Sequence, residues 1–140
     1  MSTRCNVIIK NYDKSGEPIQ YQLYHHHDGY PYGVGADLVR YIKEIQANED
    51  KGVQILSSCE KLAEYLCDPL RHDEYENEGT NIRLHGDIEY LYIIDLSTQL
   101  LECFEIDFNG ISNISFMLAN DEYPKDLKRA MLVDFELIWV

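Results

Sequence analysis

The chain of 140 residues lacks any long hydrophobic run, and no window approaches the roughly twenty consecutive apolar residues that a transmembrane helix needs. It also shows no charged leader followed by an apolar segment, so we expect neither a secretory signal nor a membrane span. Closely spaced cysteine pairs are absent as well, since the four cysteines are scattered: Cys5, Cys59, Cys67 and Cys103. We therefore expect reduced, partly buried thiols in a cytoplasmic protein, rather than disulfides or a structural zinc site.

Positive charge is scarce: 25 Asp and Glu stand against 12 Lys and Arg, which gives a formal net charge of -13 at pH 7. This charge repels phosphate backbones and anionic lipids, so neither nucleic acid nor a membrane surface is an expected partner. Residues 84–124 contain no Lys or Arg but hold these carboxylates: Asp87, Glu89, Asp95, Glu102, Glu105, Asp107, Asp121 and Glu122. Two interpretations stay open, a solvated surface that aids solubility and a docking face for a basic protein partner.

What the chain does contain is typical of a folded domain, with 45% hydrophobic and 26% charged residues. This length fits one domain, residues 1–140, with a real hydrophobic core. Alternating and β-branched patterns predict strands, and spacing of three to four predicts helices. The predicted strands cover residues 5–9, 19–25, 82–96, 100–108, 114–118 and 135–140, and the predicted helices cover residues 36–46, 58–67 and 124–133.

These elements predict an α+β fold. We expect an antiparallel sheet of about four to six strands, with two or three helices packed on one face. The run of apolar residues on both faces of residues 88–94 favours a central position for that strand.

The segment between the second strand and the first helix concentrates titratable and turn-forming residues: His25-His26-His27-Asp28-Gly29-Tyr30-Pro31-Tyr32-Gly33-Val34-Gly35. Strand alternation places His25 and His27 on one side with His26 opposed. His85 and Asp87 form a similar group at the start of the long strand. If the two strands pair, these groups meet. The candidate functional cluster is therefore His25, His27, Asp28, Tyr30, His85 and Asp87.

Two chemistries suit such a cluster. Imidazole and carboxylate ligate zinc, manganese or iron, and they also form acid–base pairs near neutral pH. A structural role competes with both, because Asp28 suits an Asx-turn and no HExxH-type ligand spacing is present. We expect no cofactor and no bound metal.

Gly33 and Gly35 resemble the start of a phosphate-binding fingerprint, but Leu38 occupies the place of its third glycine. Free amides near Gly35 are a candidate anion site. Close backbone packing is the favoured role of both glycines.

Three strings resemble a family of small uncharacterised proteins of tailed phages, prophages and bacteria: Thr3-Arg4-Cys5-Asn6-Val7, the His27-Asp28-Gly29-Tyr30-Pro31 string with Gly33 and Gly35, and Leu84-His85-Gly86-Asp87-Ile88-Glu89-Tyr90-Leu91-Tyr92. The resemblance implies a mobile-element setting and no particular activity.

The leading functional hypothesis is a non-enzymatic accessory or interaction protein. It would bind a protein partner through the acidic face and the turn from His27 to Pro31. The alternative is a small-ligand-binding or metal-dependent hydrolytic enzyme that uses the histidine and aspartate cluster. The sequence assigns no oligomeric state.

Overall fold

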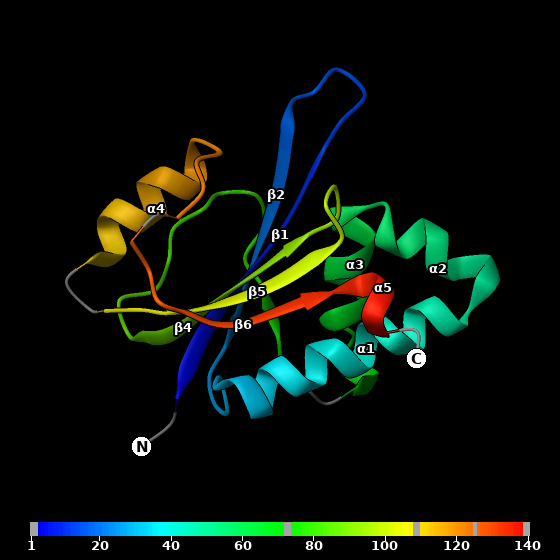
Figure 1. Cartoon of the computed structure of the whole chain (residues 1–140), viewed down its shortest axis with the longest axis horizontal. Coiled ribbons are helices and arrows are strands. Elements are labelled where there is room, and N and C mark those ends of the chain that lie inside the picture. The colour runs from blue at the N-terminus through cyan, green and yellow to red at the C-terminus, as the bar shows by residue number, and fades with distance from the viewer. Residues whose placement is uncertain (1–2, 72–73, 108–109, 125, 139–140) are drawn as a thin grey trace.

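The computed structural model describes residues 3–71, 74–107, 110–124 and 126–138, and within them a six-stranded sheet has the order β3-β2-β1-β4-β5-β6. Neighbouring strands are antiparallel except β1 and β4, which run parallel. The strands are β1 (Arg4–Tyr12), β2 (Pro18–His25), β3 (Glu76–Asn77), β4 (Ile88–Asp95), β5 (Leu100–Glu105) and β6 (Arg129–Asp134) (Figure 1).

The helices lie on both faces of this sheet (Figure 1). Three of them, α1 (Ala36–Ala47), α2 (Glu49–Leu56) and α3 (Cys59–Leu66), pack on one face, which we call the three-helix face. A fourth, α4 (Ile111–Ala119), packs on the opposite face, which we call the α4 face. Shorter turns complete the chain: η1 (Pro31–Gly35), η2 (Pro69–Arg71) and α5 (Phe135–Ile138).

Two hydrophobic cores result from strand alternation. On β1, Val7 and Ile9 point to the three-helix face while Ile8 points to the α4 face, and all three are fully buried. On β2, Leu23 points to the three-helix face and Tyr24 points to the α4 face. Each buried aliphatic side chain contributes about 1.5–3 kcal/mol of transfer free energy, so a strand with two apolar faces holds both layers together.

The α+β class is confirmed, and the sheet is mostly antiparallel. The predicted strands at residues 5–9 and 19–25 and the predicted helices at 36–46 and 58–67 match β1, β2, α1 and α3. Two details differ from the expectation: one strand pair is parallel, and α4 lies on the face opposite the other helices. The parallel pair arises because β2 ends and β4 begins at the same end of the sheet, beside Cys5 of β1, so β4 runs opposite to β2 and therefore parallel to β1.

Three predicted elements are wrong. Residues 114–118 belong to helix α4, because Ile111, Ile114 and Leu118 recur at helical spacing and bury one stripe. The helix predicted from Pro124 is replaced by β6, which pairs with β5. The strand predicted for residues 135–140 begins instead with α5, and residues 139–140 lie outside the described ones.

Candidate functional site

The turn that follows β2 is fixed to the sheet by backbone hydrogen bonds. Asp28 has φ 56°, and its carbonyl accepts a hydrogen bond from the Val34 amide at 2.7 Å. The amide of Gly29 donates to the Thr3 carbonyl at 2.9 Å, and the buried Tyr92 hydroxyl donates to the Gly29 carbonyl at 2.7 Å. A buried hydroxyl with one well-defined acceptor holds the turn in a single position on the sheet.

Both glycines of the candidate anion site are closely surrounded, Gly33 by backbone and Gly35 by side chains. A Cβ on Gly33 would overlap the Asp28 carbonyl oxygen, and one on Gly35 would lie 3.0 Å from the Met131 sulfur. The amides of Gly33 and Gly35 donate to the Tyr30 carbonyl, at 2.9 and 3.5 Å. This geometry supports the packing role of the glycines, since their amides bond within the turn.

The outer part of the turn, Tyr30-Pro31-Tyr32, is here called the tyrosine tip. The side chain of Tyr32 is 84% exposed, and its ring centroid lies 4.7 Å from that of Tyr30. The Tyr30 hydroxyl donates to an Asp28 carboxylate oxygen at 3.0 Å. That hydrogen bond raises the pKa of Tyr30 above its usual value, with a further contribution from the negative charge of Asp28. The turn therefore presents two adjacent aromatic rings from a fixed backbone.

The three histidines divide between the two faces as strand alternation predicts. His25 and His27 lie together, with ring centroids 5.0 Å apart, and His25 packs against Tyr75 of the core on the three-helix face. The His27 ring lies 3.3 Å from a Glu74 carboxylate oxygen.

The opposite face carries a second polar group, which contains His85 and Asp87. The His85 ring stacks on Tyr24 with centroids 3.8 Å apart, and His26 approaches the edge of the same tyrosine. The Tyr24 hydroxyl donates to Asp87 at 2.8 Å, and the Arg4 guanidinium lies 3.4 Å from that carboxylate. Burial and the hydrogen bond to Asp87 raise the pKa of Tyr24 to about 12.

The expected cluster is therefore divided. His25 lies on the three-helix face with His27, whereas His85 and Asp87 contact Tyr24 on the α4 face. In addition, β1 lies between β2 and β4, so the two strands do not pair. Within the described residues no group of three or more His, Cys, Asp or Glu side chains is placed to hold a metal ion.

Sequence reasoning missed the carboxylates that face the histidines. Glu74, Glu76 and Glu78 alternate along the β3 segment and contact three different histidines: His27 at 3.3 Å, His26 at 2.9 Å and His85 at 2.6 Å. The alternation of the three glutamates was visible in the sequence, but their pairing with β2 is a long-range contact that no local pattern indicates.

A hollow of about 420 Å³ adjoins the His85–Glu78 pair. Gln22 holds one wall, since its side-chain amide donates to Glu78 at 2.8 Å and its carbonyl oxygen accepts from the Arg83 amide at 2.7 Å. Behind it, the fully buried Asn6 accepts a hydrogen bond from the His85 amide at 2.9 Å. The hollow is lined by Gln22, Glu78, Asn81, Arg83, Leu84, His85 and Gly86.

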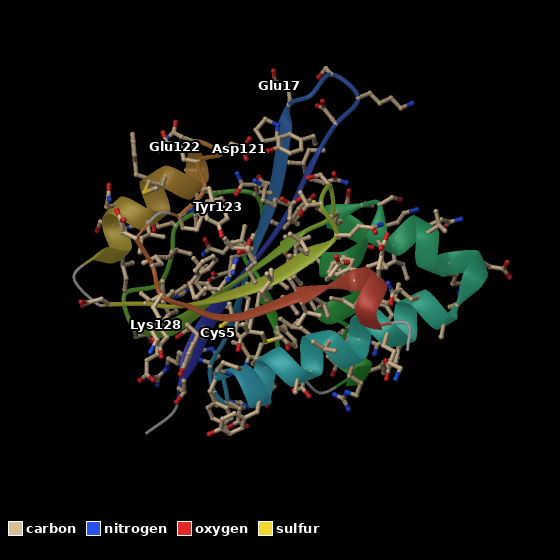
Figure 2. The ribbon with its side chains drawn as sticks, viewed as in Figure 1. Cys5, Glu17, Asp121, Glu122, Tyr123 and Lys128 are labelled. Carbon is tan, nitrogen blue, oxygen red and sulfur yellow. The ribbon has the colours of Figure 1, made fainter. Side chains whose placement is uncertain are left out.

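Much of the acidic stretch is neutralised by cations from elsewhere in the chain. Asp121 and Glu122 lie beside the end of α4 (Figure 2). The Lys10 ammonium lies 2.9 Å from an Asp121 carboxylate oxygen. Lys128 lies 3.2 Å from Glu105. The ion-paired carboxylates of the stretch are Asp87, Glu102, Glu105 and Asp121. Fewer carboxylates of residues 84–124 are therefore available to a basic partner than the sequence suggests.

Family models, curated proteins and solved structures gave no match to this chain. The resemblance to phage and prophage proteins therefore stays a prediction. None of the helices in the described residues combines the length and apolarity needed to cross a bilayer.

Proposed function

We propose that this protein binds a basic protein partner through the tyrosine tip and the carboxylates around it. The observation that carries the proposal is the fixed turn itself: Tyr92 and Thr3 hold Gly29, while Tyr32 stands 84% exposed. Exposed tyrosines on a rigid turn supply a large contact area at a low cost in conformational entropy, as binding hot spots do.

The surroundings of the tip favour a cationic partner. The Asp28 carboxylate lies at the tip itself, 3.0 Å from the Tyr30 hydroxyl. Tyr90 of β4 lies opposite Glu105 of β5, and burial, followed by the Glu105 charge, raises the pKa of Tyr90 above its usual value. Tyrosine faces beside carboxylates attract Arg and Lys side chains, both through the ring quadrupole and through charge.

A pull-down from the source cytosol in rising salt tests this proposal. The wild-type protein is expected to retain a basic protein at low salt, and the Tyr32→Ala variant is expected to lose it. The matched control is Phe116→Ala, which removes an aromatic ring of 66% exposure on α4, away from the tip. Equal retention of the same protein by all three forms, or retention of acidic proteins alone, would contradict the proposal.

A second candidate function is binding or hydrolysis of a small polar molecule in the hollow beside His85. The observation that favours it is the 2.6 Å contact between His85 Nε2 and Glu78. A carboxylate at that distance orients the imidazole ring beside the hollow, as carboxylates orient histidines that bind or transfer protons.

Thermal shift with a panel of nucleotides, phosphate esters and amino acids, together with elemental analysis for metal, tests the second candidate. A ligand of the hollow would raise the Tm of the wild type and of His26→Gln, but not that of His85→Gln. An equal shift in all three proteins, or no shift with any compound, counts against it.

A further inference from the structure

Strand β6 forms one edge of the sheet. Within the described residues it pairs with β5 alone. The Phe135 amide donates to the Gln99 carbonyl at 2.9 Å. In an antiparallel ladder every second residue bonds to the partner strand, so this bond shows which residues of β6 do so. The backbone groups of Met131 and Val133 accordingly face β5, while the backbone groups of Leu132 and the amide of Asp134 point away from the sheet.

The two edges of the sheet differ in a way that matters for pairing. At the opposite edge, β3 has only two residues, Glu76 and Asn77, and both are exposed. By contrast, β6 has six residues and contains no proline or lysine; a register shift leaves Ala130 without a partner on β5, so its regular part is Met131–Asp134. Leu132 is 47% exposed in this part. Natural proteins usually protect edges by shortness, charge, proline or a bulge, and only the Arg129–Ala130 part of β6 has such protection. The regular part, with Leu132 exposed at its centre, is therefore open to a pairing partner.

We propose that two copies of this chain associate by antiparallel pairing of their β6 strands about a two-fold axis at Leu132. Outward-facing backbone groups can bond only to outward-facing groups, and Leu132 opposite Leu132 of the second copy satisfies that condition. The pairing joins the two sheets into one continuous sheet and covers the exposed leucine of each copy.

The side chains of β6 are self-complementary in this register. Met131 lies opposite Val133 of the second copy on the three-helix face, where both residues border the core. A register centred on Asp134 would instead place two carboxylates opposite each other, which is unfavourable.

The net charge sets the salt dependence of this association. Each copy carries a formal charge of -13, so two copies repel each other over long range. Salt screens that repulsion, and self-association is therefore expected to strengthen as salt rises. Binding of a basic partner at the tyrosine tip has the opposite dependence, so the two proposals fail independently.

Sedimentation equilibrium of the full chain at about 50 and about 500 mM NaCl tests the dimer. The wild type is expected to be dimeric, more so at high salt. Leu132→Lys is expected to raise the Kd by about tenfold or more, since two lysines would face each other across the axis. Val53→Lys, at a position of 75% exposure on α2, is the matched control and is expected to leave the Kd unchanged. A monomeric wild type at both salt concentrations, or equal dimerisation of Leu132→Lys, would overturn the proposal.

Cysteine cross-linking tests the register. Leu132→Cys is expected to form an intermolecular disulfide under mild oxidation, because directly opposed Cα atoms lie within disulfide range. Ala130→Cys is the control and is expected to stay uncross-linked, because the Ala130 residues of the two copies lie on opposite sides of the axis, four residues apart along the paired strands. Equal cross-linking of both variants would contradict this register.

Discussion

Gly33 is the residue at which the tyrosine turn leaves no room for a side chain. A Cβ there would overlap the Asp28 carbonyl oxygen and also approach the Tyr30 ring. Because the obstacle includes backbone, the turn must shift to admit it. We expect Gly33→Ala to lower the free energy of unfolding by about 2 kcal/mol or more. Urea unfolding measures the loss, and Gly86→Ala, where nothing lies within 4 Å of the added Cβ, should stay within about 0.5 kcal/mol of wild type.

Tyr92 is the second residue on which the turn depends, and it allows a milder test. Tyr92→Phe removes the hydroxyl but keeps the ring, and it leaves the buried Gly29 carbonyl without its donor. We expect a loss of about 1–3 kcal/mol, together with weaker binding through the tip. Tyr21→Phe, which removes the hydroxyl of a partly buried tyrosine on β2, is the control. Unchanged stability of Tyr92→Phe would mean that another group holds the turn.

The cysteines bear out the expectation of buried thiols, since Cys5, Cys59 and Cys103 are buried and all four are unpaired. Burial raises the pKa of Cys59 and Cys103 to about 12 and that of Cys67 to about 11. Because the thiolate is the reactive form, we expect slow modification by a disulfide reagent at pH 8 in the native protein, with Cys67 first. Unfolding in urea should expose all four at once. A fast first phase that survives in Cys67→Ser would contradict this order.

At the scale of elements, a part-buried ion pair attaches the end of α4 to β1. Asp121 accepts hydrogen bonds from Lys10 at 2.9 Å and from the Tyr12 hydroxyl at 2.8 Å. Burial raises the pKa of Asp121, but these hydrogen bonds and the lysine charge outweigh it, so the pKa lies below its ordinary value of 3.8. A carboxyl group with a depressed pKa stabilises the fold fully above that ordinary value, and the contribution is lost as pH falls through the folded pKa.

The charge of this ion pair can be removed with little change in shape. Asp121 has φ 57°, a conformation that asparagine also tolerates. We expect Asp121→Asn to lose about 1 kcal/mol at pH 7 and the difference from wild type to shrink towards zero as pH falls below 3.8. Urea unfolding at several pH values measures it. The exposed neighbour Glu122 supplies the control, Glu122→Gln. A difference that stays constant down to pH 2 would contradict the charge argument.

The spacing of apolar residues correctly predicted those helices and strands in which the apolar residues recur with one clear period. The alternation of β2 and the helical stripe of α1 are examples, and their bounds were close to those observed. Patterns failed where apolar residues occupy most positions. In α4, the run around Ile114 to Leu118 fits a strand or a helix equally well, and only packing on the sheet decides. Pro124 suits the start of a helix, but pairing with β5 overrides that preference further along.

The candidate site was predictable only within one strand. Alternation separated His26 from His25 and His27, and the structure agrees. Whether His85 meets them depends on strand order, and the insertion of β1 between β2 and β4 is set by contacts far apart in sequence. His85 therefore meets Tyr24 and Glu78, which no spacing in the chain indicates.

At the scale of the whole molecule, the two hydrophobic cores lie on opposite faces of one sheet and share its strands, so they are not separate units. Val7 and Ile9 belong to the three-helix core, while Ile8, between them, belongs to the α4 core. Loss of either layer would expose one face of β1 and of the β4 strand beside it. The expectation of a single domain thus becomes an expectation of one cooperative unfolding transition, in which neither core survives the loss of the other.

Two truncations, one in each core, test this cooperativity. Leu62 of α3 is fully buried in the three-helix core, and Leu118 of α4 is 4% exposed in the other. We expect Leu62→Ala and Leu118→Ala each to cost about 2–5 kcal/mol. In each variant the urea midpoints from far-UV and near-UV circular dichroism should fall together, because both probes report the same transition. An early transition in Leu118→Ala that leaves the three-helix face folded would show that the α4 layer unfolds on its own.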